Sequence, residues 1–154
     1  MSEEKIWAQE AKTEQEKQIC FAIRETVFVK GQDVPPEEEW DDLDNQSDVC
    51  PHFIAWHLHS NGKRTAIGAA RLWLNEEHCA KAQRVAVLAA WRKKGVGRIL
   101  MDIMEAYTQA TGRNEVVLGA QTQAIPFYER IGYEAYGPEY LDAGIFHRDM
   151  NKKL

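Results

Sequence analysis

The second half of the chain alternates between strand-like and helix-like patterns, and this alternation restricts the possible folds more than any other feature of the sequence. Residues 82–88 form a β-rich apolar run, and residues 98–111 carry apolar side chains at helical spacing. Residues 115–120 suit a buried strand, and residues 124–132 suit a short helix. Strands and helices in this order favour a sheet with helices packed on its faces. We therefore expect an α/β protein.

The flanking segments add one helix and four strands. Thr13 and Glu16 suit a capping box at the start of a helix that runs to about residue 28. The Asn61-Gly62 pair is typical of a hairpin turn between two strands. The inward face of the helix is expected to carry Ile19, Ile23 and Val27, and the strands to cover residues 53–59, 64–74, 133–136 and 144–150. This order predicts a mixed sheet with helices on both faces.

Length and composition restrict the class of protein. A chain of 154 residues, with 44% hydrophobic and 28% charged residues, suits one folded domain over residues 1–154. The formal net charge of -5 argues against nucleic-acid or anionic membrane partners. No apolar run approaches the roughly 20 residues of a membrane-spanning helix, and the N-terminus lacks a signal-peptide core. Because three cysteines (Cys20, Cys50 and Cys79) do not suggest a disulfide framework, we expect a cytoplasmic protein with reduced thiols.

The stretch "RKKGVGR", residues 92–98, is the clearest candidate for a ligand site, and we call it the cationic loop. It carries four cations and stands between a β-rich run and a predicted helix. A helix N-terminus offers unpaired backbone N–H groups and the positive end of its dipole to an anion. Gly95 and Gly97 allow close approach of the backbone. The pattern suits a pyrophosphate.

Two familiar phosphate loops do not match the cationic loop. The dinucleotide pattern G-x-G-x-x-G fails because Leu100 stands where the third glycine is required, and the nucleotide pattern G-x-x-x-x-G-K-[ST] fails too. A solvated basic turn with an ordinary helix start remains the alternative.

The stretch "RVAVLAAWRKKGVGRILMDIMEAYTQATG" resembles the acetyl-coenzyme A loop of the GNAT acetyltransferase superfamily. The family pattern [QR]-x-x-G-x-[GA] is matched by Arg92, Gly95 and Gly97. Farther on, "QTQAIPFYERIGYEAYG" resembles a second family signature, in which a short helix carries a tyrosine and ends before a glycine-aromatic pair. The stretches "IRETVFVKGQDVPPEEEWDDLD" and "YLDAGIFHRDM" are similar to small bacterial members of the ElaA and YjcF type. The resemblance covers nearly the whole chain.

The resemblance implies a mostly antiparallel GNAT-type sheet and an acetyl-coenzyme A-dependent N-acetyltransferase that acts in a ternary complex. Backbone amides of residues 84–87 would hold the pantetheine and polarise the thioester carbonyl, where this strand splays from residues 115–120. Tyr128 is the implied general acid toward the leaving thiolate. The implied cofactor contacts are Val85, Ala86, Val87, Arg92, Lys93, Lys94, Gly95, Val96, Gly97, Arg98, Gln121 and Phe127. Two departures are Gln121, where many relatives have Asn, and Gln83, where a small residue is common.

The acceptor side is less defined by the sequence. An ammonium acceptor must lose a proton, and Glu39, Asp41, Asp42 and His147 are candidates to accept or relay it. Residues 37–44, which we call the acidic segment, form either a solvated turn or a mouth that attracts a cationic amine. The acceptor is a small molecule or a protein amino group. The oligomeric state stays open, with a homodimer as one option.

Several other interpretations compete. The pairs Cys50/His52 and His57/His59 have spacings that suit a metal, but they also fit an exposed strand after Pro51, and we expect no metal. The cysteines lack an evident His partner, which argues against a covalent acyl-cysteine. A sensor that binds acyl-coenzyme A without turnover is one alternative. An enzyme similar to acyl-homoserine-lactone synthases, suggested by "IRETVFV", is another.

Overall fold

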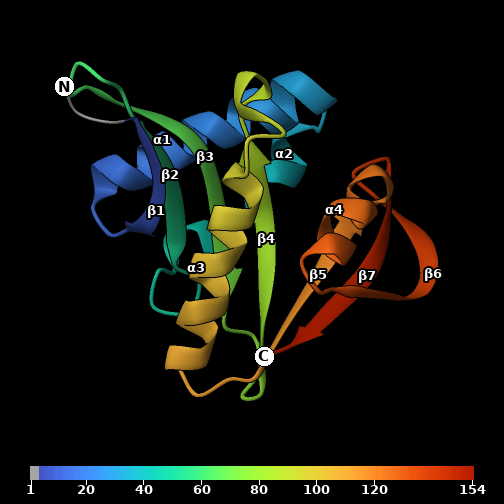
Figure 1. Ribbon diagram of the computed structural model, residues 1–154. Helices are drawn as coiled ribbons and strands as arrows, with labels where there is room; N and C mark the ends of the chain where they lie inside the picture. The colour runs from blue at the N-terminus through green and yellow to red at the C-terminus, as the bar shows by residue number, and fades with distance from the viewer. Residues whose placement is uncertain (1–3) are drawn as a thin grey trace.

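The computed structural model describes residues 4–154, which contain one seven-stranded sheet in the order β1-β2-β3-β4-β5-β7-β6 (Figure 1). The strands are β1 (Lys5–Ala11), β2 (His52–Leu58), β3 (Arg64–Trp73), β4 (Cys79–Val87), β5 (Glu115–Gln121), β6 (Glu134–Asp142) and β7 (Ile145–Lys153). Neighbours pair antiparallel except β4 and β5, which run parallel. The expected mixed, mostly antiparallel sheet is confirmed.

Helices cover both faces of this sheet. The helical segments are α1 (Glu14–Arg24), η1 (Glu25–Lys30), α2 (Pro36–Glu39), η2 (Asp42–Asn45), η3 (Ala89–Trp91), α3 (Val96–Ala110), η4 (Thr122–Ala124) and α4 (Ile125–Arg130). In Figure 1, α3 and α4 lie in front of the sheet, and α1 lies behind it. Within residues 4–154, no helix combines the length and the apolar character needed to cross a membrane.

The start of α1 follows directly from its sequence. The Glu16 N–H donates to the Thr13 hydroxyl over 3.1 Å, and the Thr13 N–H donates to the Glu16 carboxylate over 3.1 Å. The expected capping box is therefore confirmed. The α-helix ends at Arg24, however, and continues to Lys30 as the π-helix η1. The wider turn of a π-helix is often found at functional sites, and no simple residue pattern predicts it here.

Two buried clusters lie on opposite faces of the sheet. The front cluster joins the β2–β5 strands to α3 and α4, and it includes Phe53, Leu100, Met104 and Tyr128. The back cluster joins the sheet to α1 and η1, and it includes Ile23, Val27 and Ile54. Consecutive residues of one strand face opposite sides, so Phe53 belongs to the front cluster and Ile54 to the back cluster.

The centre of the sheet opens between β4 and β5. These strands pair only over their first three positions, the last of which joins Lys81 to Val117. Figure 1 shows the two strands side by side at their lower ends and diverging toward the top. Past Lys81, the edge of β4 that faces β5 has no strand partner. Its backbone N–H and C=O groups are therefore free to meet a ligand.

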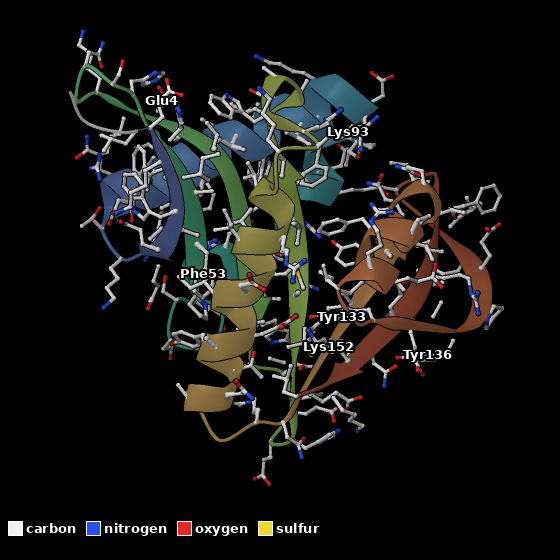
Figure 2. The ribbon with its side chains drawn as sticks, in the orientation of Figure 1. Glu4, Phe53, Lys93, Tyr133, Tyr136 and Lys152 are labelled. Carbon is white, nitrogen blue, oxygen red and sulfur yellow. The ribbon has the colours of Figure 1, made fainter. Side chains whose placement is uncertain are left out.

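Below this opening, polar contacts join α3 to the C-terminal segment that contains β6 and β7. Glu105 on α3 accepts hydrogen bonds from the Tyr133 hydroxyl at 2.8 Å and from the Lys152 ammonium at 3.0 Å. Figure 2 shows Tyr133 and Lys152 close together between α3 and the C-terminal strands. Burial and the nearby Glu105 carboxylate raise the pKa of Tyr133, so the phenol remains a donor.

Two expectations about the N-terminal half need correction. The strand β1 was not predicted, although it alternates Ile6 and Ala8 toward the front cluster with Trp7 toward the back cluster. Because β1 and β3 flank β2, and helices cover both faces, β2 is buried over His52 to His57 instead of exposed. The C-terminal hairpin is also longer than expected, reaching from Glu134 to Lys153.

Candidate active site

A cavity of about 950 Å³ occupies the opening between β4 and β5. Val85 and Phe127 line it and pack with the front cluster. Val27 and Ile145 also line it, but they belong with the back cluster. The cavity therefore reaches from one face of the sheet to the other. A ligand from the front and a second ligand from the back can meet within it.

The cationic loop forms the front rim of this cavity. Gly95 takes the left-handed conformation (φ 84°) at the residue before α3, and no side chain caps the helix. The N–H groups of the first turn of α3 therefore have no intrahelical partner and point toward the loop. A Cβ on Gly95 would meet no atom within 4 Å, whereas a Cβ on Gly97 would lie 3.1 Å from the Phe127 ring. The loop presents open backbone donors beside the cavity.

The charges of the cationic loop are exposed and lack acidic partners among residues 4–154. Arg92, Lys93 and Arg98 line the cavity and form no salt bridge within the described chain. Figure 2 shows Lys93 above the start of α3. Lys94, one of the implied cofactor contacts, does not line the cavity, and its ammonium lies 5.2 Å from the centre of the Trp91 ring. Uncompensated cations next to unpaired N–H groups are suited to binding an anion.

Strand β4 contributes an irregular stretch of backbone to the cavity wall. Arg84 adopts a left-handed conformation (φ 55°), and the pairing of β3 with β4 shifts register between Ala69 and Arg71. Such bulges redirect side chains near functional sites. Val85 and Val87 line the cavity, whereas Ala86 is buried in the back cluster.

Tyr128 lies inside the cavity wall on α4. Its ring packs on Phe127 and on Tyr133, with centroid distances of 4.9 and 5.8 Å. The side chain is 8% exposed, and burial raises the pKa of its phenol to about 12. Within residues 4–154 its hydroxyl has no hydrogen-bond partner. The group is a protonated donor at neutral pH, held beside the cavity without a competing acceptor.

The acidic segment is bound to arginines from three other elements. Arg24 of α1 donates to Glu39 at 2.8 Å and to Asp44 at 2.6 Å. Arg71 of β3 donates to Asp41 at 2.7 Å and to Asp44 at 2.8 Å. The solvated-turn interpretation is therefore wrong for Glu39 and Asp44, which are 3% and 6% exposed.

Arg84 completes this network and connects it to the cavity. Its guanidinium lies 3.3 Å from the Glu39 carboxylate and donates to the Glu39 carbonyl at 3.1 Å. Glu38, Glu39 and Arg84 line the cavity, whereas Asp41 does not. Three guanidinium groups thus neutralise carboxylates that the sequence alone presents as a free acidic surface.

The surroundings of this network raise the pKa of one carboxyl group and lower the pKa values of two others. Burial raises the pKa of Glu39, and hydrogen bonding to Arg24 only partly opposes this. Burial also acts on Asp44, but Arg24 and Arg71 outweigh it, so the pKa of Asp44 lies below its usual value. The hydrogen bond from Arg71 lowers the pKa of Asp41. Asp41 and Asp44 are therefore anchored anions, while Glu39 is held less firmly in the charged form.

The back of the cavity carries a row of polar side chains from three strands. Gln121, His147 and Tyr140 stand opposite one another in register across β5, β7 and β6. The Gln121 amide exchanges hydrogen bonds with Gln32, at 2.8 and 3.1 Å, and so ties β5 to the segment after η1. The Tyr140 hydroxyl donates to Asp149 at 2.7 Å. All three row residues line the cavity.

Comparison with known proteins identifies the family of this chain. Residues 52–154 match the acetyltransferase (GNAT) domain. The relative named "Uncharacterized N-acetyltransferase YjcF" from Bacillus subtilis is 41% identical over 143 residues, covering 92% of this chain and 96% of the relative. The chain belongs to the GNAT acetyltransferase family.

Solved GNAT structures have the same architecture. A "putative N-acetyltransferase" from Lactobacillus plantarum superposes with a TM-score of 0.82 at 24% identity, covering 99% of each chain. Escherichia coli ElaA superposes with a TM-score of 0.77 at 22% identity, covering 96% of this chain and 99% of ElaA. An aminoglycoside 6'-N-acetyltransferase complexed with coenzyme A gives a TM-score of 0.70 at 13% identity, covering 97% of this chain and 96% of that chain. These likenesses show the fold, and the expected GNAT family is confirmed.

Some features of this GNAT site were not found in the sequence. The arginine network depends on Arg24 and Arg71, which lie 47 residues apart in the sequence and appear there as isolated cations. Tyr140 was also missed, although its register partner His147 was singled out. An arginine within an apolar run, such as Arg71 in "AIGAARLWL", is the signal that was available, because a charge in a buried strand requires a partner.

The cysteines and the His57/His59 pair are the remaining candidates for chemistry that the sequence offered in this GNAT domain. The thiols of Cys20, Cys50 and Cys79 are buried and free, and burial raises the pKa of Cys20 to about 12 and of Cys50 to about 11. Such thiols are poor nucleophiles at neutral pH. The His57 and His59 rings contact edge to face at 4.4 Å.

Proposed function

We propose that the protein is an acetyl-coenzyme A-dependent N-acetyltransferase, in which a primary amine attacks the thioester directly within a ternary complex. The observation that carries the proposal is the cavity through the sheet, with the cationic loop at its front rim and polar side chains at its back. Membership of the GNAT family supports acetyl transfer. The neighbour solved with coenzyme A supports the choice of cosubstrate.

The cationic loop is the proposed binding site of the pyrophosphate of acetyl-coenzyme A. Anionic oxygens accept hydrogen bonds from the first-turn N–H groups of α3 and from Arg92, Lys93 and Arg98. The free edge of β4 past Lys81 offers amide and carbonyl groups to the pantetheine, which is itself a chain of amides. The thioester then lies in the opening between β4 and β5, within reach of an amine that enters from the back.

Tyr128 is the proposed acid for the leaving group. As the tetrahedral intermediate collapses, the C–S bond breaks and the sulfur gains negative charge. The Tyr128 hydroxyl donates a hydrogen bond to this sulfur and transfers its proton as the thiolate leaves. The raised pKa of Tyr128 ensures that it carries a proton at neutral pH. Its lack of a partner among residues 4–154 leaves the hydroxyl free for the substrate.

Calorimetric titration with acetyl-coenzyme A, with coenzyme A and NAD as controls, tests the binding step. We expect selective binding of the coenzyme A pair. Thiol release is then followed with spermidine, glucosamine and a short peptide as amine acceptors. Thiol release with at least one acceptor supports the proposal, whereas binding without release would leave an acyl-coenzyme A sensor.

The variant Tyr128→Phe tests the acid role. We expect kcat to fall about 100-fold, with unchanged affinity for acetyl-coenzyme A. The matched control is Tyr136→Phe, because Tyr136 is 48% exposed on β6 and does not line the cavity (Figure 2). A Tyr128→Phe enzyme with the turnover of the control would remove the acid role but not the proposed reaction.

A further inference from the structure

The imidazole of His147 is held in one tautomer by the backbone. Its Nδ1 lies 2.7 Å from the carbonyl oxygen of Ile145. A carbonyl oxygen can only accept a hydrogen bond, so Nδ1 carries the proton when the ring is neutral. The lone pair is then on Nε2, which forms no hydrogen bond within residues 4–154. Because His147 lines the cavity, this lone pair is available to a ligand there.

Neighbouring residues fix the plane of the imidazole. The Tyr140 ring stacks on His147 with a centroid distance of 5.9 Å and an interplanar angle of 20°. Asp149 in turn anchors the Tyr140 hydroxyl. Gly119 makes room for this arrangement, since a Cβ there would lie 2.5 Å from the Tyr140 hydroxyl oxygen. Tyr140, Asp149 and Gly119, together with the carbonyl of Ile145, thus keep the His147 ring in one position.

Other proton acceptors of the cavity are less suited to an amine. Glu39 is bound by Arg24 and Arg84. Glu38 and Asp142 line the cavity but are exposed, so water solvates their carboxylates. His147 is half-buried, on the back face from which the amine is proposed to enter.

We propose that His147 is the general base of the reaction, a catalytic residue that accepts the amine proton at Nε2, with Tyr140 and Asp149 as positioning residues. This inference rests on the proposed N-acetyltransferase function. The neutral amine forms the N–C bond, and the carbonyl π electrons move to oxygen. Nε2 then takes one proton from the amine nitrogen. The carbonyl re-forms as the C–S bond breaks, and Tyr128 protonates the sulfur. Amide and free thiol result, and the proton on His147 returns through solvent to Tyr128.

The proposed base role of His147 makes the reaction depend on pH, and charged groups near the ring influence this dependence. Protonation of the ring removes the lone pair on Nε2 and with it the base. The titratable and charged groups close to His147 along β6 and β7 include Glu139, Tyr140, Asp142, Arg148 and Asp149, and Glu38, Glu39 and Arg84 line the same cavity.

The kinetic test compares His147→Gln with the wild-type protein on the acceptor that gives the fastest thiol release among spermidine, glucosamine and the peptide. We expect kcat to fall about 100-fold, with unchanged calorimetric affinity for acetyl-coenzyme A. The protonation of the amine substrate changes the rates of both proteins equally, so it does not affect the ratio of the wild-type rate to the variant rate. This ratio should decrease toward low pH, because only the wild-type protein loses a base there. A ratio that does not change with pH would overturn the proposal.

The matched control is His78→Gln, because His78 is exposed in the turn before β4 and does not line the cavity. It should retain wild-type rates. Tyr140→Leu, which removes the stacked ring, should lower kcat about 10-fold and leave the affinity for acetyl-coenzyme A unchanged. A histidine that only supports the fold would instead lower the thermal stability of His147→Gln without changing the pH profile.

An NMR measurement tests the geometry without any acceptor. In ¹⁵N-labelled protein, neutral His147 should show a protonated Nδ1 and an unprotonated Nε2. The opposite tautomer would overturn the proposal even if the protein acetylates amines. Wild-type protein that binds acetyl-coenzyme A and releases thiol, with a His147→Gln variant that does so equally well, would refute the base role alone. Absence of thiol release by the wild-type protein would refute both proposals.

Discussion

The cationic loop and the acidic segment are both rich in charge, yet they lie in opposite electrostatic environments. The loop cations are exposed and have no acidic partner among residues 4–154, and Arg92, Lys93 and Arg98 line the cavity. The acidic segment buries Glu39 and Asp44 against guanidinium groups from α1, β3 and β4. The first arrangement leaves charge for a ligand, and the second uses charge to fix a loop. Local charge density therefore does not distinguish a binding site from a structural network.

The largest expected effect is on the free energy of unfolding, and it should be found in the acidic segment and not in the cationic loop. Arg24→Met removes the guanidinium that binds Glu39 and Asp44 and lies 4.7 Å from the Trp40 ring centre. We expect the free energy of unfolding to fall by about 3 kcal/mol, because breaking a buried pair leaves carboxylates undercompensated. Urea denaturation measures this loss.

The matched variant in the cationic loop is Arg92→Met. Its side chain is exposed and unpaired among the described residues, so the free energy of unfolding should change by less than about 0.5 kcal/mol. Equal losses in the two variants would contradict the distinction between the regions.

The second prediction concerns ligand affinity, for which we expect the larger effect in the cationic loop. Arg92→Met should weaken acetyl-coenzyme A binding about 10-fold, because a charge-assisted hydrogen bond contributes about 1.5–3 kcal/mol and part of it is offset by solvent exposure. The remaining affinity should also depend less on salt. Calorimetry at low and high ionic strength measures both effects, and unchanged affinity would remove Arg92 from the proposed pyrophosphate site.

The smallest expected effect concerns acid stability. The lowered pKa values of Asp41 and Asp44 imply that their contribution to stability is complete above the usual carboxyl pKa of about 3.9 and is lost as pH falls through the lowered values. The raised pKa of Glu39 acts in the opposite direction, since its protonation in the folded state begins at higher pH. The net loss should therefore be confined to strongly acidic solution.

Urea denaturation from about pH 2 to pH 7 tests this expectation. Asp44→Asn should lower stability at neutral pH and flatten the acid dependence, whereas Arg92→Met should keep the wild-type acid dependence. An Asp44→Asn protein that loses stability in acid as steeply as the wild-type protein would contradict the assigned role of Asp44.

Much of the fold was predictable because its signals are local. The capping box at Thr13, the glycine after α3 and the hairpin at Asn61-Gly62 each depend on residues a few positions apart. The strand β1 and the burial of β2 were not predicted, because burial is decided by neighbouring strands and helices that are distant in sequence. The π-helix η1 was missed for the same reason, since its cavity-lining face packs on distant elements.

In the candidate site, too, the parts that depend on local sequence signals were predicted, and the parts that depend on distant residues were not. The front rim was predicted from the spacing of Arg92, Gly95 and Gly97, and the structure places these residues beside the cavity. At the back, Glu39 and Asp41 were expected as free acids but are bound by arginines. Arg84 entered the prediction only within residues 84–87 for its backbone, although its side chain joins this network to the cavity wall.

By itself, the sequence determined the order of most helices and strands and the position of the cationic loop, because these depend on short-range spacing. The family was implied by the resemblance of its motifs to those of known proteins. Only the tertiary structure decided which charges are free and which are paired. It also decided which nitrogen of His147 carries the lone pair, since that depends on a hydrogen bond to the backbone and on a ring from another strand. The physical reason is that pairing and burial depend on distances between residues far apart in the chain, which residue spacing does not encode.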